Sequence, residues 1–145
     1  MAKALIDDGH QVTALSRRTG TDLEKLGVKV VQGSLQDLDN IAAAAVEADA
    51  VLHLAFDNDL SKYAASNLQD LAVIKTLNKA LAGSGKLFVS TSGTALVGDT
   101  GENLADESAP AQGPRAAPEA AGLEVWPASV QDCTTQLSPY HTCIL

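Results

Sequence analysis

The chain has 145 residues, of which 46% are hydrophobic, and this suits one folded domain with its own core. The net charge of −8 argues against a nucleic-acid surface, and no apolar run reaches the roughly 20 residues that a membrane span needs. The two cysteines, Cys133 and Cys143, lie near the C-terminus and form no disulfide framework, so we expect a cytoplasmic protein.

The first third of the chain alternates short helices with short strands. Residues 2–8 carry apolar side chains at helical spacing and end at Gly9, so they predict a helix. An apolar run at 12–15 predicts a buried strand. Residues 21–26 predict a second helix, and the valine-rich residues 28–31 predict the next strand.

The same alternation continues with longer elements. Residues 37–47 predict a helix, and the nearly continuous apolar run at 50–55 is typical of a strand covered on both faces. Residues 59–82 predict a long helix, and residues 87–89 predict another buried strand. The long helix has an apolar stripe at spacings of three and four: Leu60, Tyr63, Ala64, Leu68, Leu71, Ile74 and Leu77.

Strands and helices that alternate at this spacing imply an α/β fold with parallel strands joined by right-handed crossovers. The pattern weakens beyond residue 98, where residues 114–122 predict one more helix. Residues 123–145 show no sustained period. We therefore expect a domain at 1–122 followed by an irregular tail at 123–145.

Four stretches carry a family resemblance through their order and spacing. They read AKALIDDGHQVTALSRR, GVKVVQGSLQD, ADAVLHLAF and KLFVSTSGTALVG. With them, residues 3 to about 121 resemble the short-chain dehydrogenases/reductases of the extended or atypical branch, which includes the NAD-dependent epimerases/dehydratases. The resemblance implies an NAD(P)-binding domain and names no substrate.

The resemblance also implies a central first strand that leads into a Gly-x-x-Gly-x-x-Gly turn, where the pyrophosphate meets a helix N-terminus. This sequence begins inside that helix, and the glycine triplet occurs nowhere in it. We therefore expect a three-layer, Rossmann-like parallel sheet that lacks the first strand and its glycine-rich loop. The strands at 12–16 and 50–55 should then pair directly, or the sheet should split between them, at a serious cost in stability.

The resemblance places the adenosine end of the cofactor beside the second strand. There an NAD enzyme usually has an acid that accepts from the ribose 2′-OH, and this chain has Ser16 followed by Arg17 and Arg18. Guanidinium groups suit a 2′-phosphate, so we expect NADP, with NAD as the other possibility. An exposed loop pair is the alternative interpretation of the two arginines.

Two further segments complete the implied cofactor site. Ser34 and Leu35 match the position that touches adenine, although a surface turn explains them equally well. The end of the fourth family strand should run along the ribose and diphosphate, through His53, Leu54, Ala55 and Phe56. A histidine within an apolar run is more often a satisfied core residue than a catalyst. No other His or Cys stands at metal-ligand spacing, so we expect no zinc site.

The catalytic candidates follow the strand at 87–89. Ser92 matches the serine that polarises the substrate carbonyl, with Thr91 and Thr94 as neighbours that could substitute, or these hydroxyls simply satisfy local backbone groups. The family's Tyr-x-x-x-Lys pair should fall near residues 115 and 119, which are Arg115 and Glu119. Arg115 could bind a substrate anion, or form a surface ion pair with Glu119.

Three hypotheses remain open on function. The chain is part of an NADP-dependent oxidoreductase or epimerase that is inactive as this piece, or a non-catalytic nucleotide sensor of the same fold, or a truncated product without independent function. The resemblance implies a small-molecule substrate for the full-length parent and the possibility of a homodimer through the long helix. We expect no nucleic-acid or membrane partner.

Overall fold

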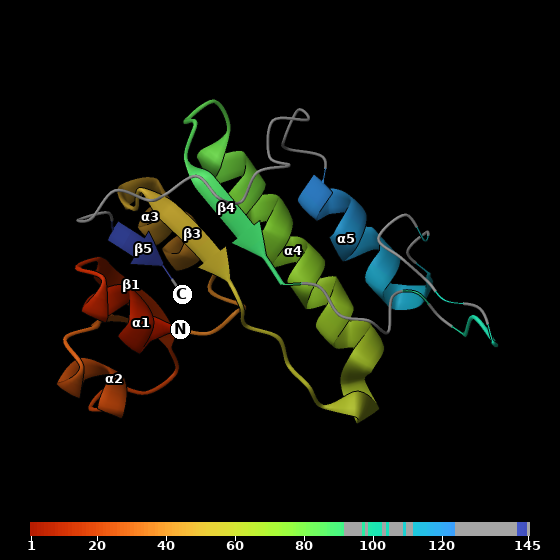
Figure 1. Cartoon of the computed structure of the whole chain (residues 1–145), viewed down its shortest axis with the longest axis horizontal. Coiled ribbons are helices and arrows are strands. Elements are labelled where there is room, and N and C mark those ends of the chain that lie inside the picture. The colour runs from red at the N-terminus through yellow and green to blue at the C-terminus, as the bar shows by residue number, and fades with distance from the viewer. Residues whose placement is uncertain are drawn as a thin grey trace.

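The computed structural model describes residues 1–91, 97, 99–102, 104, 109, 112–123 and 142–144. Within these residues, five strands form one sheet in which every paired strand is parallel, in the order β2-β1-β5-β3-β4 (Figure 1). The strands are β1 (Gln11–Ser16), β2 (Lys29–Gln32), β3 (Ala50–His53), β4 (Leu87–Ser90) and β5 (Thr142–Ile144). The prediction that the four strands before residue 98 share one parallel sheet is confirmed.

Helices connect the strands and cover the sheet. The helical segments are α1 (Ala2–Asp7), α2 (Asp22–Lys25), α3 (Leu38–Glu47), the 3-10 turn η1 (Leu60–Lys62) that leads into α4 (Tyr63–Leu81), and the 3-10 turn η3 (Gly113–Arg115) that leads into α5 (Ala116–Leu123). Gly9, with a φ of 88°, follows α1 in the left-handed conformation that lets the chain leave a helix and enter a strand. No helix in these described ranges has the length and hydropathy needed to cross a bilayer.

The side chains of β1 show that both faces of the sheet are covered. Val12 and Ala14 are buried in a cluster with apolar residues of α1. Thr13 and Leu15, which alternate with them, line a pocket together with residues of α3 and α4. Successive side chains of a strand point to opposite faces, so α1 lies over one face and α3 and α4 lie over the other. This is a Rossmann-like α/β arrangement.

The main hydrophobic core lies between the sheet and the α3–α4 pair. Val51 of β3 packs there with Ile74 and Leu77 of α4 and with Ala45 of α3, all at most 3% exposed. Alanine at position 45 is 0% exposed and allows the close approach of α3 to α4. This core holds α4 against the sheet, and the N-terminal part of α4 lies near the carboxyl ends of β3 and β4. The candidate site lies at these ends.

The position between β1 and β3 is filled from the far end of the chain. The backbone of Cys143 is in register with Val12 on one side and with Ala50 on the other. The expectation that the sheet would split, or that β1 would pair directly with β3, is therefore wrong. The strand belongs to the segment that the sequence indicated as irregular, because three residues are too few to show a period.

Two sequence-based boundaries need correction. The apolar run at 50–55 ends as a strand at His53, whose Cα partner Ser90 is the last residue of β4. Leu54, beyond that point, is 40% exposed. The long helix at 59–82 begins as a 3-10 turn and becomes α-helical at Tyr63.

The apolar stripe proposed for the long helix is wrong in its first half. Leu60 is 83% exposed and Leu68 is 69% exposed, whereas Asn67 and Asp70 are each 2% exposed. Ile74 and Leu77 are buried as expected. Polar side chains thus occupy the buried face of α4 at its N-terminal end, close to the ends of β3 and β4.

Candidate functional site

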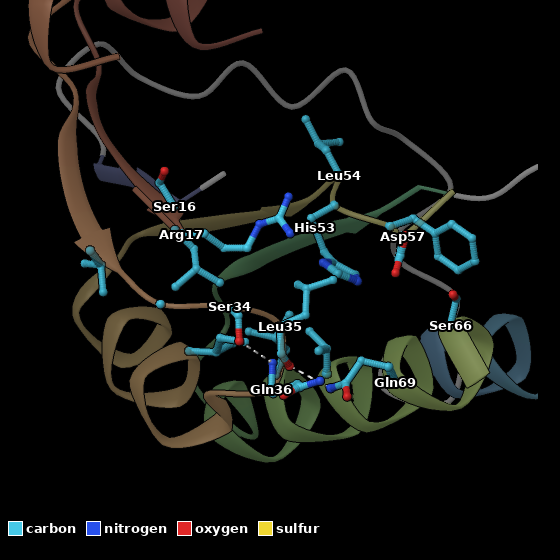
Figure 2. Close-up of a pocket in the computed structure, with 18 of the residues that line it drawn as sticks. Ser16, Arg17, Ser34, Leu35, Gln36, His53, Leu54, Asp57, Ser66 and Gln69 are labelled. Atoms are coloured by element: carbon cyan, nitrogen blue, oxygen red, sulfur yellow. Dashed lines mark hydrogen bonds between the residues drawn. The ribbon is translucent and has the colours of Figure 1, made fainter. Parts of the chain in front are cut away.

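A pocket of about 950 Å³ opens at the carboxyl ends of β1 and β3 (Figure 2). Its walls come from the end of β1, the loop after β2, the end of β3 and the buried face of α4. Ligands of open parallel sheets bind at this edge of the sheet. All nine residues that the resemblance assigned to the cofactor line the pocket: Ser16, Arg17, Arg18, Ser34, Leu35, His53, Leu54, Ala55 and Phe56.

The pocket is cationic in an acidic chain. Three of the ten Lys and Arg side chains line it, against one of the eighteen Asp and Glu side chains, Asp57. Lys62 is paired with Asp59 at 3.1 Å. Arg17 and Arg18 are exposed and form no ion pair with any carboxylate in the described part of the chain. The two guanidinium groups are therefore available to an anionic ligand.

The loop that carries the arginines is held by the hydroxyl of Ser16. Its Oγ donates to the carbonyl of Arg18 at 2.8 Å and accepts from the Arg18 N–H at 3.3 Å. The N–H of Gly33 donates to the Ser16 carbonyl at 2.9 Å. A Cβ at position 33 would lie 3.1 Å from Cδ1 of Leu15, so glycine allows this close approach. The ends of β1 and β2 thus form one fixed rim.

The loop after β2 is organised by Asp37, which precedes α3. Its Oδ2 accepts from the backbone N–H of Ser34 at 2.6 Å and from the Ser34 hydroxyl at 2.9 Å. Asp37 is the N-cap residue of α3, and its carboxylate accepts from this loop rather than from an N–H of the helix. The Ser34 hydroxyl is thus already bonded within the loop. Its contact with adenine stays a prediction. Gln69 of α4 fixes the same loop by donating to the Leu35 carbonyl at 2.6 Å.

We expect the Asp37→Asn variant to lose stability at neutral pH and to converge with the parent in acid. The backbone and hydroxyl hydrogen bonds from Ser34 lower the pKa of Asp37 below its ordinary value of 3.8. The ionised carboxylate therefore stabilises the fold at pH values above 3.8. This stabilisation is lost as the pH falls through the lowered pKa of Asp37. Thermal unfolding at pH 7, 5 and 3 measures this. An equal difference in Tm at all three pH values would contradict it.

A buried ionic network lies at the deep end of the pocket. Asp70 of α4 accepts through Oδ1 from Nε2 of His53 at 2.6 Å, and through Oδ2 from Nη1 of Arg115. His53, Asp70 and Arg115 are 7%, 2% and 8% exposed. The carboxylate of Asp70 and the guanidinium of Arg115 carry opposite charges, and the imidazole of His53 donates to the second carboxylate oxygen. No charge in this network is therefore left unpaired.

The same network joins the ends of two strands. Nη2 of Arg115 donates to the carbonyl of Thr91 at 2.7 Å. The N–H and the hydroxyl of Thr91 donate to the carbonyl of His53 at 3.0 and 3.2 Å. The Arg115 guanidinium also stacks over the ring of Phe56, with Cζ 5.4 Å from the ring centroid. The Arg115 side chain of η3 therefore contacts α4, the residue that follows β4 and the segment that follows β3.

These contacts bear on the catalytic candidates. Arg115 is buried and pairs with Asp70, so its interpretation as a surface residue is wrong, while the side chain of Glu119 lies outside the described part of the structure. Its role toward a substrate stays a prediction, and so does that of Thr91, whose hydroxyl satisfies the backbone of His53. Ser92 and Thr94 lie outside the described residues. The histidine is the satisfied core residue that its apolar surroundings indicated, and it also lines the pocket.

Asp70 is the residue of this network that the sequence analysis missed. A signal for it exists in the chain. The buried positions Leu81, Leu77 and Ile74 of α4 continue toward the N-terminus at steps of three and four to Asp70 and Asn67. A carboxylate on that stripe has to be paired, because a lone buried charge is too costly.

The NAD dependent epimerase/dehydratase family matches residues 1–120. The chain belongs to this family. Two fungal proteins are similar to this chain. The uncharacterized protein C2A9.02 of Schizosaccharomyces pombe is 30% identical over 70% of this chain and 35% of its own length. The uncharacterized protein YLL056C of Saccharomyces cerevisiae is 31% identical over 62% of this chain and 32% of its own length. The chain thus spans about a third of the length of these two relatives. No solved structure matches it significantly.

Proposed function

We propose that the pocket binds the adenosine half of a nicotinamide dinucleotide and prefers NADP to NAD. One observation carries the proposal: the three segments that the family resemblance assigned to the cofactor line a single pocket. Its two exposed arginines have no described carboxylate partner. Membership of the epimerase/dehydratase family makes a nicotinamide cofactor the expected ligand.

The residues present fit the phosphorylated end of such a cofactor. In Figure 2 the Arg17 side chain extends from the end of β1 over the pocket, toward the segment that begins at Leu54. A guanidinium in this position can donate two hydrogen bonds to a 2′-phosphate, whereas no side chain of the described rim offers the carboxylate that would accept from a free 2′-OH. The closest acid of the pocket, Asp57, lies after β3 and at the other wall.

For the whole protein we propose an oxidoreductase or epimerase. The bound nicotinamide would supply hydride transfer to or from a carbinol or carbonyl carbon. The pocket residues of this chain would bind the dinucleotide and exclude water at the strand ends. The chain contains no Tyr-x-x-x-Lys pair, so we propose that it does not perform proton transfer by itself.

A nucleotide sensor without catalysis is the second candidate. It is favoured by Arg115, which stands where the catalytic tyrosine is expected by counting and whose guanidinium donates to Asp70 and Thr91. A protein of the relatives' full length that binds NADPH but neither oxidises nor reduces a panel of alcohols and ketones would favour the sensor. If the chain binds no nucleotide, the remaining hypothesis is a truncated product without independent function.

The direct test of the cofactor preference compares adenosine 2′,5′-bisphosphate with 5′-AMP by calorimetric titration of the chain. We expect the 2′-phosphate to tighten binding by about 10- to 100-fold, the range of one or two charge-assisted hydrogen bonds. Arg17→Asp should remove most of this difference and leave 5′-AMP affinity nearly unchanged. Lys25→Asp, an exposed cation outside the pocket, is the matched control. Equal loss for both nucleotides would contradict the NADP assignment.

A further inference from the structure

The hydrogen bonds of the His53–Asp70–Arg115 network belong to a closed ring that also includes the backbone of Thr91 and His53. Starting at His53, the ring runs from its imidazole to Asp70, to Arg115, to the carbonyl of Thr91, and from the N–H of Thr91 back to the carbonyl of His53. The members come from β3, from α4, from η3 and from the residue that follows β4. A change at any member therefore reaches the backbone at the mouth of the pocket.

The charges of the ring decide the state of the imidazole. The guanidinium of Arg115 is always protonated, and the carboxylate of Asp70 accepts from its Nη1. A carboxylate oxygen accepts and does not donate, so the hydrogen at the His53–Asp70 contact belongs to Nε2. In the neutral ring the other nitrogen, Nδ1, then carries a lone pair. The ring chemistry thus selects one tautomer of a histidine that lines the nucleotide pocket.

We propose that Asp70 and Arg115 are positioning residues of this pocket: they hold His53 as the Nε2–H tautomer and clamp the ends of β3 and β4. The cofactor part of this inference rests on the proposed nucleotide function, and the tautomer part does not. In this role Arg115 acts through Asp70 and Thr91, each of which accepts from one of its terminal nitrogens.

Long-range nitrogen-15 correlation spectra of the imidazoles at pH 8 test the tautomer without any ligand. The chain has three histidines, and the His53→Gln variant identifies the signals of His53. We expect the Nε2–H pattern in the parent. The variant that combines Asp70→Leu with Arg115→Met leaves no buried charge unpaired and removes the acceptor, so it should show a mixture of both tautomers.

The matched control combines Asp70→Asn with Arg115→Met. Asparagine keeps an oxygen that can accept from Nε2, so this variant should retain the Nε2–H pattern. The affinity for NADPH provides the second readout. We expect the leucine-containing variant to bind NADPH about tenfold more weakly than the asparagine-containing one, the change expected for about one well-made hydrogen bond. Circular dichroism of both variants should show the parent's fold.

The possible outcomes separate the two ideas. An Nδ1–H pattern in the parent, or an unchanged Nε2–H pattern in the leucine-containing variant, would overturn the positioning role. So would NADPH affinities within twofold of each other in the two variants, if the parent binds NADPH. A parent that shows the expected tautomer switch but binds no NADPH would disprove the nucleotide function and leave the tautomer lock standing.

Discussion

Replacing Arg115 with methionine should lower the free energy of unfolding by about 3 to 5 kcal/mol, because it leaves the carboxylate of Asp70 buried without its counter-charge. The side chain of Asp70 is 3% exposed and that of Arg115 is 10% exposed, so water cannot replace the lost partner. For a domain of ordinary stability this is a large fraction of the total. Chemical denaturation followed by circular dichroism measures it.

The double variant Asp70→Asn with Arg115→Met is the control for this effect. It removes both charges and keeps an acceptor for His53, so it should be more stable than Arg115→Met alone by about 1 to 3 kcal/mol. Asp22→Asn, which removes one partner of the exposed Asp22–Lys25 pair, should change stability by less than about 1 kcal/mol. A double variant less stable than Arg115→Met alone would show that the unpaired carboxylate of Asp70 does not cause the loss of stability.

Deletion of residues 142–145 should destabilise the chain by about 2 to 5 kcal/mol, because β5 contributes ladders to two neighbours and each ladder hydrogen bond contributes about 0.5 to 1.5 kcal/mol. The strand is registered against Gln11–Thr13 of β1 and against Ala50–Val51 of β3. Its loss leaves two parallel edges facing each other in the middle of the sheet. Thermal unfolding of the deletion variant measures the effect.

A pair of substitutions at Cys143 separates the backbone from the side chain. Cys143→Pro removes an N–H and cannot pair as a central strand residue, so it should approach the effect of the deletion. Cys143→Ala keeps the N–H and should stay close to the parent. If the deletion and Cys143→Pro both unfold at the parent's temperature, β5 does not hold the two halves of the sheet together.

The alternation of elements could be predicted from the sequence because it depends on local signals, and the nine pocket residues could be named because the family resemblance assigned them. Short apolar runs such as 12–15 indicate buried strands, and residues that follow parallel strands meet at one edge of the sheet. The resemblance then placed Ser16–Arg18 and His53–Phe56 at that edge.

The remaining features depend on contacts between distant segments, which no local pattern contains. The partner of Arg115 is 45 positions away, at Asp70, and its proximity requires the packing of η3 and α5 on α4. Leu60 and Leu68 fit a helical period and yet are exposed, because the polar residues Asn67 and Asp70 occupy the buried face of α4. The three residues of β5 carry too little pattern to indicate a strand.

Amide chemical shifts of the nitrogen-15-labelled chain, titrated with adenosine 2′,5′-bisphosphate, test most directly that the strand ends form one nucleotide site. We expect perturbations at residues 16–18, 33–36 and 53–56 that saturate together with a single dissociation constant. Perturbations confined to residues 26–29 and 44–48, around the smaller pocket at the opposite ends of the strands, would contradict the assignment. Spectra that do not change at saturating ligand would contradict it equally.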